Sequence, residues 1–294
     1  MTKKSASSVE KSPNLWIAPT KSNASLKVSV LCPTRGRPEN AKRLLESVKK
    51  THVGPVAIGF YCDEDDPSLS EYDVPHMTGP DFKFAMKCEV LVSKTDGDIL
   101  MMVGDDAVFK TEGWDNALRG CQEVWPDGIW AASMWDGTRG KEIEGDDKRR
   151  KLGHPHPAVG RAWHDAVGYL AHPMFIHFCT DPWITSMAME LERFMYFPEI
   201  LCDHRRAGLV KDVEQDDTYK RMRPDGQATI SVRDRSVSRM FERYRILDRE
   251  TLRSKMYVQC HDGTSGYQNP GPVSRESVSP GVWQSNFEFP PEGQ

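Results

Sequence analysis

The 294-residue sequence lacks any apolar run of the roughly 18 residues that would cross a membrane. Its best apolar run, Ile99 to Val103, stops at Gly104-Asp105-Asp106. The amino terminus is polar and has no apolar core typical of a signal peptide. These absences predict a cytoplasmic protein that has no membrane partner.

An excess of one charge and paired cysteines are also missing. Lys and Arg number 39 against 43 Asp and Glu, a net charge of -4, which argues against general coating of nucleic acid but leaves room for a local basic groove. The seven cysteines are odd in number and none are spaced as C-x-x-C. Disulfide pairing and a thiolate zinc cluster are therefore disfavoured, and a reducing cytosol is favoured.

The sequence does contain material for a sizeable core, with 38% hydrophobic residues and eight tryptophans. Residues 1–25 are rich in Lys, Ser, Asn and Pro without periodicity, which predicts a disordered leader. Residues 261–294 form a Gly/Pro/Ser-rich tail. Between them we expect one catalytic domain over residues 26–225 and a helical extension over residues 226–260.

Short apolar runs alternate with helical patterns in the central part of the chain. Strands are predicted at 26–32, 56–62, 99–103 and 129–134, and helices at 38–48, 84–92 and 114–125. This alternation indicates an α/β domain with a mostly parallel central sheet. Ligands bind beyond the carboxyl ends of such strands, and three of the predicted strands end there in polar loops.

The polar loops carry chemistry that suits a nucleotide and a cation. Thr34-Arg35-Gly36-Arg37 offers backbone amides and guanidiniums to a phosphate, although a simple turn with solvated arginines is the alternative. The acidic residues 63–66 could accept hydrogen bonds from a base or ribose, or form a solvated turn. Asp105 and Asp106 would repel one another unless they faced a divalent cation, with a solvated or capping role as the alternative.

The order of these motifs resembles that of the GT-A glycosyltransferases, particularly the family 2-like group, over residues 27–222. The resemblance implies a Rossmann-like GT-A fold and a D-x-D motif at Gly104-Asp105-Asp106, where Gly104 replaces the first Asp of many members. Asp106 would be the ligand of Mn²⁺ or Mg²⁺, and Asp105 would lie nearer the ribose. The other nucleotide-sugar-binding residues it implies are Pro33, Thr34, Arg35, Arg37 and Asp63.

Two later segments extend the resemblance. Inverting members place a carboxylate at the start of a helix, which here implies Asp181 as general base, although an N-cap before Pro182 is the alternative. We expect that helix to continue through Phe194. The resemblance implies His204 as a further metal ligand, against the alternative of a surface histidine, and Arg205 could neutralise the leaving diphosphate.

The acceptor is the least specified part of the prediction. Trp135 and Trp163 lie in the region where family members bind the acceptor, although core packing is the default for each. The arginine-rich segment 233–256 follows a helical stripe. It could dock a polyanion such as DNA, but ion pairs on its own surface are favoured. Asp216-Asp217-Thr218-Tyr219 is interpreted as a helix start.

The leading hypothesis is a metal-dependent, nonprocessive and inverting glycosyltransferase that moves a sugar from a nucleoside-diphosphate sugar, a UDP-sugar first, to an acceptor hydroxyl. A GT-A nucleotidyltransferase ranks lower because the Gly-rich L-x-G-G-x-G-T-R loop is missing. A third hypothesis is a catalytically degenerate nucleotide-binding or scaffold protein. A carbohydrate, a protein side chain and a hydroxylated base in DNA are all open as acceptors.

Overall fold

The computed structural model describes residues 23–138, 154–206, 215–221 and 229–256, together with the residue pairs 258–259 and 265–266. The predicted leader therefore lies outside the described residues except for Asn23–Ser25, which forms a short 3-10 turn. The predicted tail lies outside them except for β10 (Ser265–Gly266), which pairs with β9 (Val258–Gln259).

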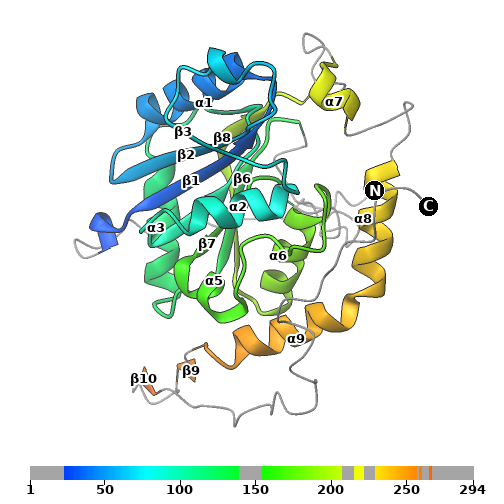
Figure 1. Ribbon diagram of the computed structural model, residues 1–294. Coiled ribbons are helices and arrows are strands. Elements are labelled where there is room, and N and C mark those ends of the chain that lie inside the picture. Colours follow the sequence, from blue (N-terminus) through cyan, green and yellow to red (C-terminus); the bar gives the residue numbers. More distant parts are fainter. Residues whose placement is uncertain are drawn as a thin grey trace, which may run out of the picture.

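The first half of the domain is a parallel β-α-β arrangement (Figure 1). β1 (Val28–Thr34) pairs in parallel with β2 (Val56–Asp63) and β4 (Ile99–Met102), and β2 pairs with the short β3 (His76–Gly79). Helix α1 (Pro38–Thr51) begins at Pro38 because a proline needs no amide partner in the first turn. Helix α2 (Phe84–Val92) completes the elements predicted for this half.

The second half adds both parallel and antiparallel strands. β6 (Ala131–Trp135) pairs in parallel with β8 (Phe194–His204), while β7 (Ala158–Gly160) runs antiparallel to both β4 and β6. β5 (Ala107–Phe109) runs antiparallel to β8 and completes a mostly parallel eight-stranded sheet in the order β3-β2-β1-β4-β7-β6-β8-β5. The expected α/β architecture is confirmed, but β3, β5 and β7 are too short to show a periodic pattern.

Helices cover both faces of the sheet (Figure 1). On one face α1 and α3 (Trp114–Val124) pack their apolar side chains against β1 and β4. On the other face α2, α5 (Arg161–Val167) and α6 (Thr180–Glu190) form a second cluster around Trp163 and Trp183. Helix α6 ends at Glu190 and does not continue to Phe194, because Glu192 adopts a left-handed backbone conformation and Phe194 begins β8.

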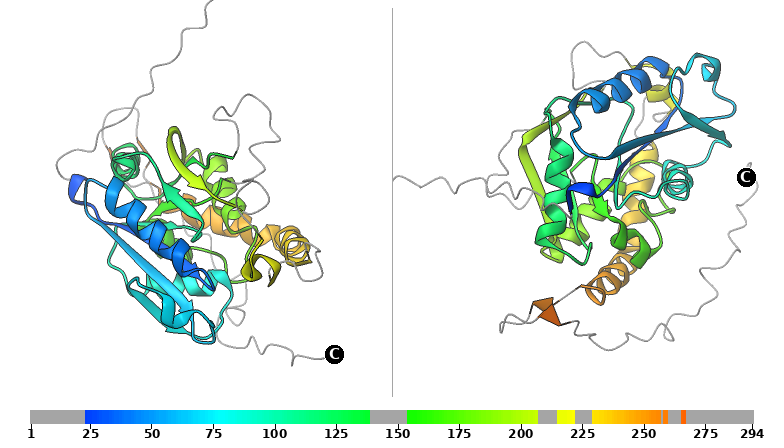
Figure 2. Two further views of the ribbon diagram at one scale, coloured as in Figure 1. Left: turned by 90° about the horizontal axis from the view of Figure 1, so that it is seen from above. Right: turned by 90° about the vertical axis from the view of Figure 1, so that its left-hand side faces the viewer.

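The arginine-rich segment forms two helices where one continuous stripe was expected. α8 (Thr229–Met240) and α9 (Glu242–Arg253) meet at Phe241, and Figure 2 shows the pair running along the edge of the domain. Helix α9 packs on α5 and α6. Arg245 and Arg249 both pair with Glu190 of α6, so the favoured interpretation of an ion-paired face holds for α9.

Helix α7, the cysteines and the lengths of the helices complete the description of the fold. Helix α7 (Asp217–Arg221) begins where the sequence predicted a helix start. The cysteines of the described ranges are free thiols, and all of them except Cys179 are buried. None of the helices in the described part of the chain is long and apolar enough to span a membrane.

Candidate functional site

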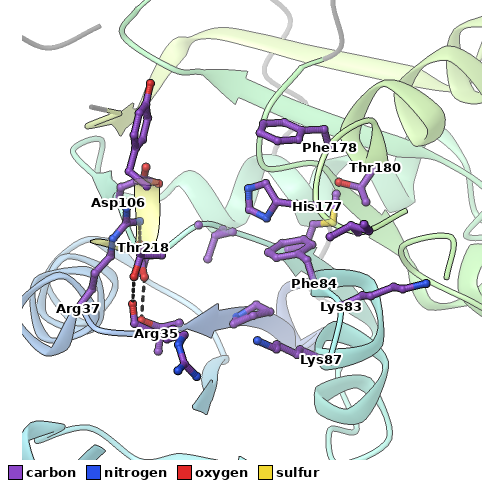
Figure 3. Close-up of a pocket in the computed structure, with 18 of the residues that line it drawn as sticks. Arg35, Arg37, Lys83, Phe84, Lys87, Asp106, His177, Phe178, Thr180 and Thr218 are labelled. Carbon is purple, nitrogen blue, oxygen red and sulfur yellow. Dashed lines mark hydrogen bonds and ion pairs between the residues drawn. The ribbon is translucent and has the colours of Figure 1, made fainter. Parts of the chain in front are cut away.

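A cavity of about 460 Å³ opens beyond the carboxyl ends of β1, β2 and β4. Figure 3 shows side chains from both halves of the domain facing its interior. Most of the residues predicted for the site line this one pocket: Pro33, Thr34, Arg35, Arg37, Asp63, Asp105, Asp106, Asp181 and His204. Segments more than 100 residues apart in sequence are thus brought together.

Three predicted site residues are not among the residues that line the pocket. Trp163 is completely buried in the cluster between α5 and α6, so it packs as a core residue and offers no face to an acceptor. Trp135 ends β6 away from the pocket lining. Arg205 donates its backbone N–H to the carbonyl oxygen of Asp106 at 2.8 Å, and its neighbour Arg206 lines the pocket in its place.

Asp105 is buried and fully engaged by the first loop. Its Oδ2 accepts a hydrogen bond from the Thr34 hydroxyl at 2.7 Å, and its Oδ1 accepts one from Arg37 Nη1 at 2.9 Å. Burial raises the pKa of Asp105, although the guanidinium of Arg37 opposes that effect. Asp105 therefore holds the loop that follows β1 against the end of β4.

Asp106 points into the pocket beside His204. Its Oδ1 lies 3.3 Å from His204 Nε2, and each side chain is 19% exposed. Burial alone would raise the pKa of Asp106, but the hydrogen bond and charge of His204 outweigh burial and hold that pKa below its usual range. Burial likewise lowers the pKa of His204, and Asp106 more than reverses this, so the pKa of His204 is raised. The β5–β8 pairing, in which Ala107 is opposite His204, brings the two residues together.

Gly104, at the first position of the predicted D-x-D motif, lies close to the Asp106 side chain. A Cβ at Gly104 would lie 2.6 Å from Asp106 Oδ1, closer than Cβ atoms approach other heavy atoms. Gly104 N–H also donates to Nδ1 of the buried His156 at 3.3 Å, which assigns the proton of that ring to Nε2. Burial lowers the pKa of His156 to about 3, so the ring is neutral.

The loop after β1 is more constrained than the sequence indicated. Asp66 accepts the Gly36 N–H at 2.7 Å and the Tyr72 hydroxyl accepts the Arg37 N–H at 3.1 Å, so these two amides, which were expected to face a phosphate, are already bonded. Arg37 also pairs with Asp216, which lies just before α7, through Nε and Nη2 at 2.6 and 2.8 Å. The side chains of this loop that line the pocket, and not the amides of Gly36 and Arg37, are therefore the groups that could meet a ligand.

Asp63 is placed at the pocket with its charge already balanced. Its carboxylate is fully buried and forms ion pairs with Arg35 Nη1 at 3.1 Å and with Lys87 Nζ at 2.5 Å. Burial raises the pKa of Asp63, and the ion pair with Lys87 opposes this effect. The sequence did not indicate Lys87, which lies on the pocket side of α2.

Asp181 lies in the first turn of α6. The residue at the N-cap is Cys179, which has a left-handed backbone conformation, so Asp181 does not occupy the capping position that was its alternative role. Its side chain is partly exposed and lines the pocket. A carboxylate in that place can approach a hydroxyl group held between α6 and β4.

Sequence reasoning missed the aromatic and basic wall that faces the acidic residues. Lys83 and Phe84 at the start of α2, and His177 and Phe178 before α6, all line the cavity (Figure 3). His177 and Phe178 come from a loop without periodicity, and nothing in the sequence indicated that Lys83 and Phe84 of the predicted helix face the pocket. An unusual density of His and Phe at 172–178 was the one available signal.

The residues present fit a hard divalent cation. Asp106 supplies a carboxylate oxygen and His204 an imidazole nitrogen at the floor of a polar pocket. Within the described ranges no group of three or more His, Cys, Asp and Glu side chains could hold a metal ion unaided. Such a pair suits Mg²⁺ or Mn²⁺ sites, because these ions are commonly held by one or two protein ligands together with substrate phosphates and water.

Comparison with solved structures shows similarity to glycosyltransferases. A mannosyltransferase from Pyrobaculum calidifontis, in complex with GDP-Man and Mn²⁺, matches 63% of this chain and 59% of its own at 12% identity, with a TM-score of 0.50. TarS residues 1–349 from S. aureus match at 14% identity and a TM-score of 0.47, both with UDP (60% of each chain) and with UDP-GlcNAc (64% of this chain and 61% of that one).

The chain thus spans less than two thirds of the length of these structures. At such identity the likeness to the mannosyltransferase is one of fold. No protein-family model matches the sequence, and none of the curated proteins compared is significantly similar to it.

Proposed function

We propose that this chain, which has the GT-A glycosyltransferase fold, is a metal-dependent, nonprocessive, inverting glycosyltransferase that uses a nucleoside-diphosphate sugar. The observation that carries the proposal is the convergence of the first loop, the Asp105-Asp106 pair, Asp181 and His204 on one polar cavity. Fold alone does not specify chemistry, so the argument rests on what these side chains can do together.

Asp106 and His204 would hold Mn²⁺ or Mg²⁺, and the bound cation would neutralise charge on the diphosphate as it leaves. Arg206 also lines the pocket and would add positive charge for that group. Pro33, Thr34 and Arg35 would border the nucleoside, and Arg35 is already oriented by Asp63. A UDP-sugar is the first donor to test.

Asp181 would accept the proton of the acceptor hydroxyl as that oxygen attacks the anomeric carbon. Attack from the α6 side, opposite the Asp106 side, gives inversion at that carbon. Arg245, Arg249 and Arg253 of α9 are paired with carboxylates, and Arg243 contacts the ring of Tyr244, so this helix gives little support for a polyanionic acceptor. The acceptor class is therefore not part of this proposal.

The test measures release of UDP or GDP from a panel of sugar nucleotides with MnCl₂ or MgCl₂, with and without EDTA. We expect wild-type protein to turn over one donor and Asp106→Asn to lose at least about 100-fold of that rate, because the carboxylate is a direct cation ligand. Asp217→Asn is the matched control, since Asp217 is fully exposed on α7 and does not line the pocket.

Full activity of Asp106→Asn, or activity that EDTA leaves unchanged, would refute the metal-dependent mechanism. Release of pyrophosphate from a nucleoside triphosphate would instead identify a nucleotidyltransferase. Failure to bind any nucleotide in the presence of Mn²⁺ would identify the degenerate scaffold.

A further inference from the structure

The segment 176–178 forms the wall of the pocket opposite Asp106, and it has no regular secondary structure. Loops of this kind usually hold their backbone groups by hydrogen bonds to water or to neighbouring side chains. Here three successive backbone N–H groups, those of Ile176, His177 and Phe178, donate to a single carboxylate, that of Asp234 in α8.

Asp234 is completely buried, and its carboxylate is surrounded by hydrogen-bond donors. Oδ1 accepts the Ile176 N–H at 3.1 Å, and Oδ2 accepts the His177 and Phe178 N–H groups at 3.0 and 2.9 Å. Arg233 Nη1 donates to Oδ1 at 2.6 Å. Hydrogen bonds to an ionised group are about twice as strong as neutral ones, so this carboxylate fixes the loop tightly.

The same loop is held at two further points. Arg233 Nη1 also donates to the Met174 carbonyl oxygen at 3.1 Å, and the Phe84 N–H of α2 donates to the Ile176 carbonyl oxygen at 3.0 Å. The backbone is therefore bonded on one side to α8 and on the other to α2. Helix α8 belongs to the C-terminal extension, so an element outside the central sheet shapes the pocket.

The side chain of His177 is the group that this arrangement presents. Its ring lies edge-on between Phe84, at a centroid distance of 5.3 Å, and Phe178, at 4.9 Å, and Figure 3 shows it projecting into the pocket. In the described part of the chain neither of its ring nitrogens has a hydrogen-bond partner. Burial lowers the pKa of His177 to about 4, so the ring is neutral and has one donor and one acceptor.

We propose that His177 is a substrate-binding residue that hydrogen-bonds a sugar hydroxyl in the pocket, and that Asp234 is the positioning residue that fixes it there through the amides of residues 176–178. The inference rests on the proposed function, because it takes the ligand to carry hydroxyl groups. A neutral imidazole suits this ligand, since a hydroxyl both donates and accepts.

The first experiment tests the positioning by hydrogen exchange. In Asp234→Asn one oxygen becomes an NH₂ group that faces at least one backbone N–H, so peptides covering 174–179 should exchange at least about tenfold faster. Asp248→Asn is the matched control, because Asp248 is a carboxylate of the neighbouring α9 that accepts the Tyr169 hydroxyl and does not line the pocket. It should leave the exchange of 174–179 unchanged.

The second experiment tests the substrate contact and identifies the hydroxyl. Binding of UDP, UDP-GlcNAc, GDP and GDP-mannose with MnCl₂ is measured by calorimetry for wild type, His177→Ala, His177→Gln and Asp234→Asn, beside donor turnover. If the hydroxyl belongs to the donor sugar, His177→Ala and Asp234→Asn should bind the sugar nucleotide about tenfold more weakly than wild type and bind the bare nucleotide equally well. If the hydroxyl belongs to the acceptor, the same variants should bind the sugar nucleotide and the bare nucleotide as wild type does, and their turnover should be about tenfold slower. His177→Gln should recover part of either loss.

Unchanged exchange in Asp234→Asn would overturn the positioning role. Wild-type binding and turnover in His177→Ala would overturn the substrate contact. If wild-type protein binds none of these sugar nucleotides, the proposed function fails and the role of His177 fails with it. The exchange result still decides whether Asp234 holds the loop, so the two failures are distinguishable.

Discussion

The two walls of the pocket are built on opposite principles. In the wall formed by the first loop and by residues 63 and 105, the charged side chains neutralise one another, as in the Arg37–Asp105 and Arg35–Asp63 pairs. In the wall formed by residues 176–181 the stabilising charges lie behind the surface, on α8, and bind the backbone. The side chain of His177 is left without a polar partner in the described structure.

This difference means that the residues that stabilise the fold and the residues that contact the ligand lie mainly in different walls. Removing one member of a buried ion pair leaves the other charge uncompensated, so changes in the first wall should lower the free energy of unfolding. In the second wall, Asp181 and His177 are the side chains that we propose to contact the substrate. Changing either one should lower activity with little effect on folding. The predictions below test this separation, beginning with the largest effect.

Asp181→Asn should slow donor turnover about 1000-fold, since a positioned general base contributes about 10²–10⁴-fold. Its free energy of unfolding should change by less than about 1 kcal/mol, the usual scale for one charge near a helix N-terminus. Steady-state kinetics and urea denaturation on the same preparation measure both. Unfolding of Asp181→Asn at a clearly lower urea concentration, or turnover at the wild-type rate, would contradict the proposed difference between the walls.

Asp105→Ala should lower the free energy of unfolding by about 3 kcal/mol. It leaves the mostly buried Arg37 with one of its two carboxylate partners, and it leaves the Thr34 hydroxyl with only its longer contact to the Tyr72 hydroxyl, at 3.3 Å. Asp216→Ala is the matched variant. It removes the other partner of Arg37, but that carboxylate is 41% exposed, so the expected loss is below about 1 kcal/mol. Equal losses in urea denaturation would contradict the role of burial.

Asp248→Asn changes a buried carboxylate of α9 that belongs to neither wall, and its effect on stability should depend on pH. Burial raises the pKa of Asp248 to about 6, with the Tyr169 hydroxyl opposing that shift. The unfolded carboxyl ionises near pH 4, so folding loses stability as pH rises from about 4 to about 6 and the penalty is then complete. Asn carries no charge, so the variant should gain about 2 kcal/mol over wild type between pH 4 and pH 7.5. Thermal melts across this range would show a constant difference if the idea is wrong.

Thr218→Ala should have the smallest effect and a local one. The Thr218 hydroxyl donates to the Arg35 carbonyl oxygen at 2.7 Å, a contact worth about 1 kcal/mol that ties α7 to the first wall. Exchange of amides at 215–221 should therefore rise severalfold while the global unfolding midpoint stays within error. Lys220→Ala is the control, since the one ion pair of Lys220 within the described residues is with the exposed Asp217. Equal exchange in the two variants would remove α7 from the description of that wall.

The first wall could be predicted from the sequence because its residues follow strands with a strong pattern. Residues 28–32 form a nearly continuous β-branched and apolar run, and Pro38 marks the helix start, so the loop between them was located correctly. Asp105 and Asp106 follow an apolar run in the same way. The sequence could not predict which groups form hydrogen bonds with this loop. Nothing local to residues 66 and 72 indicates that they bond the amides of residues 36 and 37.

The second wall could not be predicted from the sequence, for a related reason. Its shape depends on Asp234, which is more than 50 residues away in an arginine-rich segment that favoured interpretation as an exposed face. One pattern could have indicated it: Asp234 shares a helical stripe with Val237 and Phe241, so it lies on the apolar side of α8. A carboxylate on that side must find partners within the fold. The roles of the site residues remain predictions for the variants above.

Gly104 has a consequence for how this sequence can change. The space that a side chain at 104 would need is occupied by the Asp106 carboxylate, 2.6 Å from the position of a Cβ. An acidic residue at position 104 would therefore displace the Asp106 carboxylate from its present position beside His204. The residue at 104 and the orientation of Asp106 are coupled, so a library that aims to restore an acid there should vary both positions together.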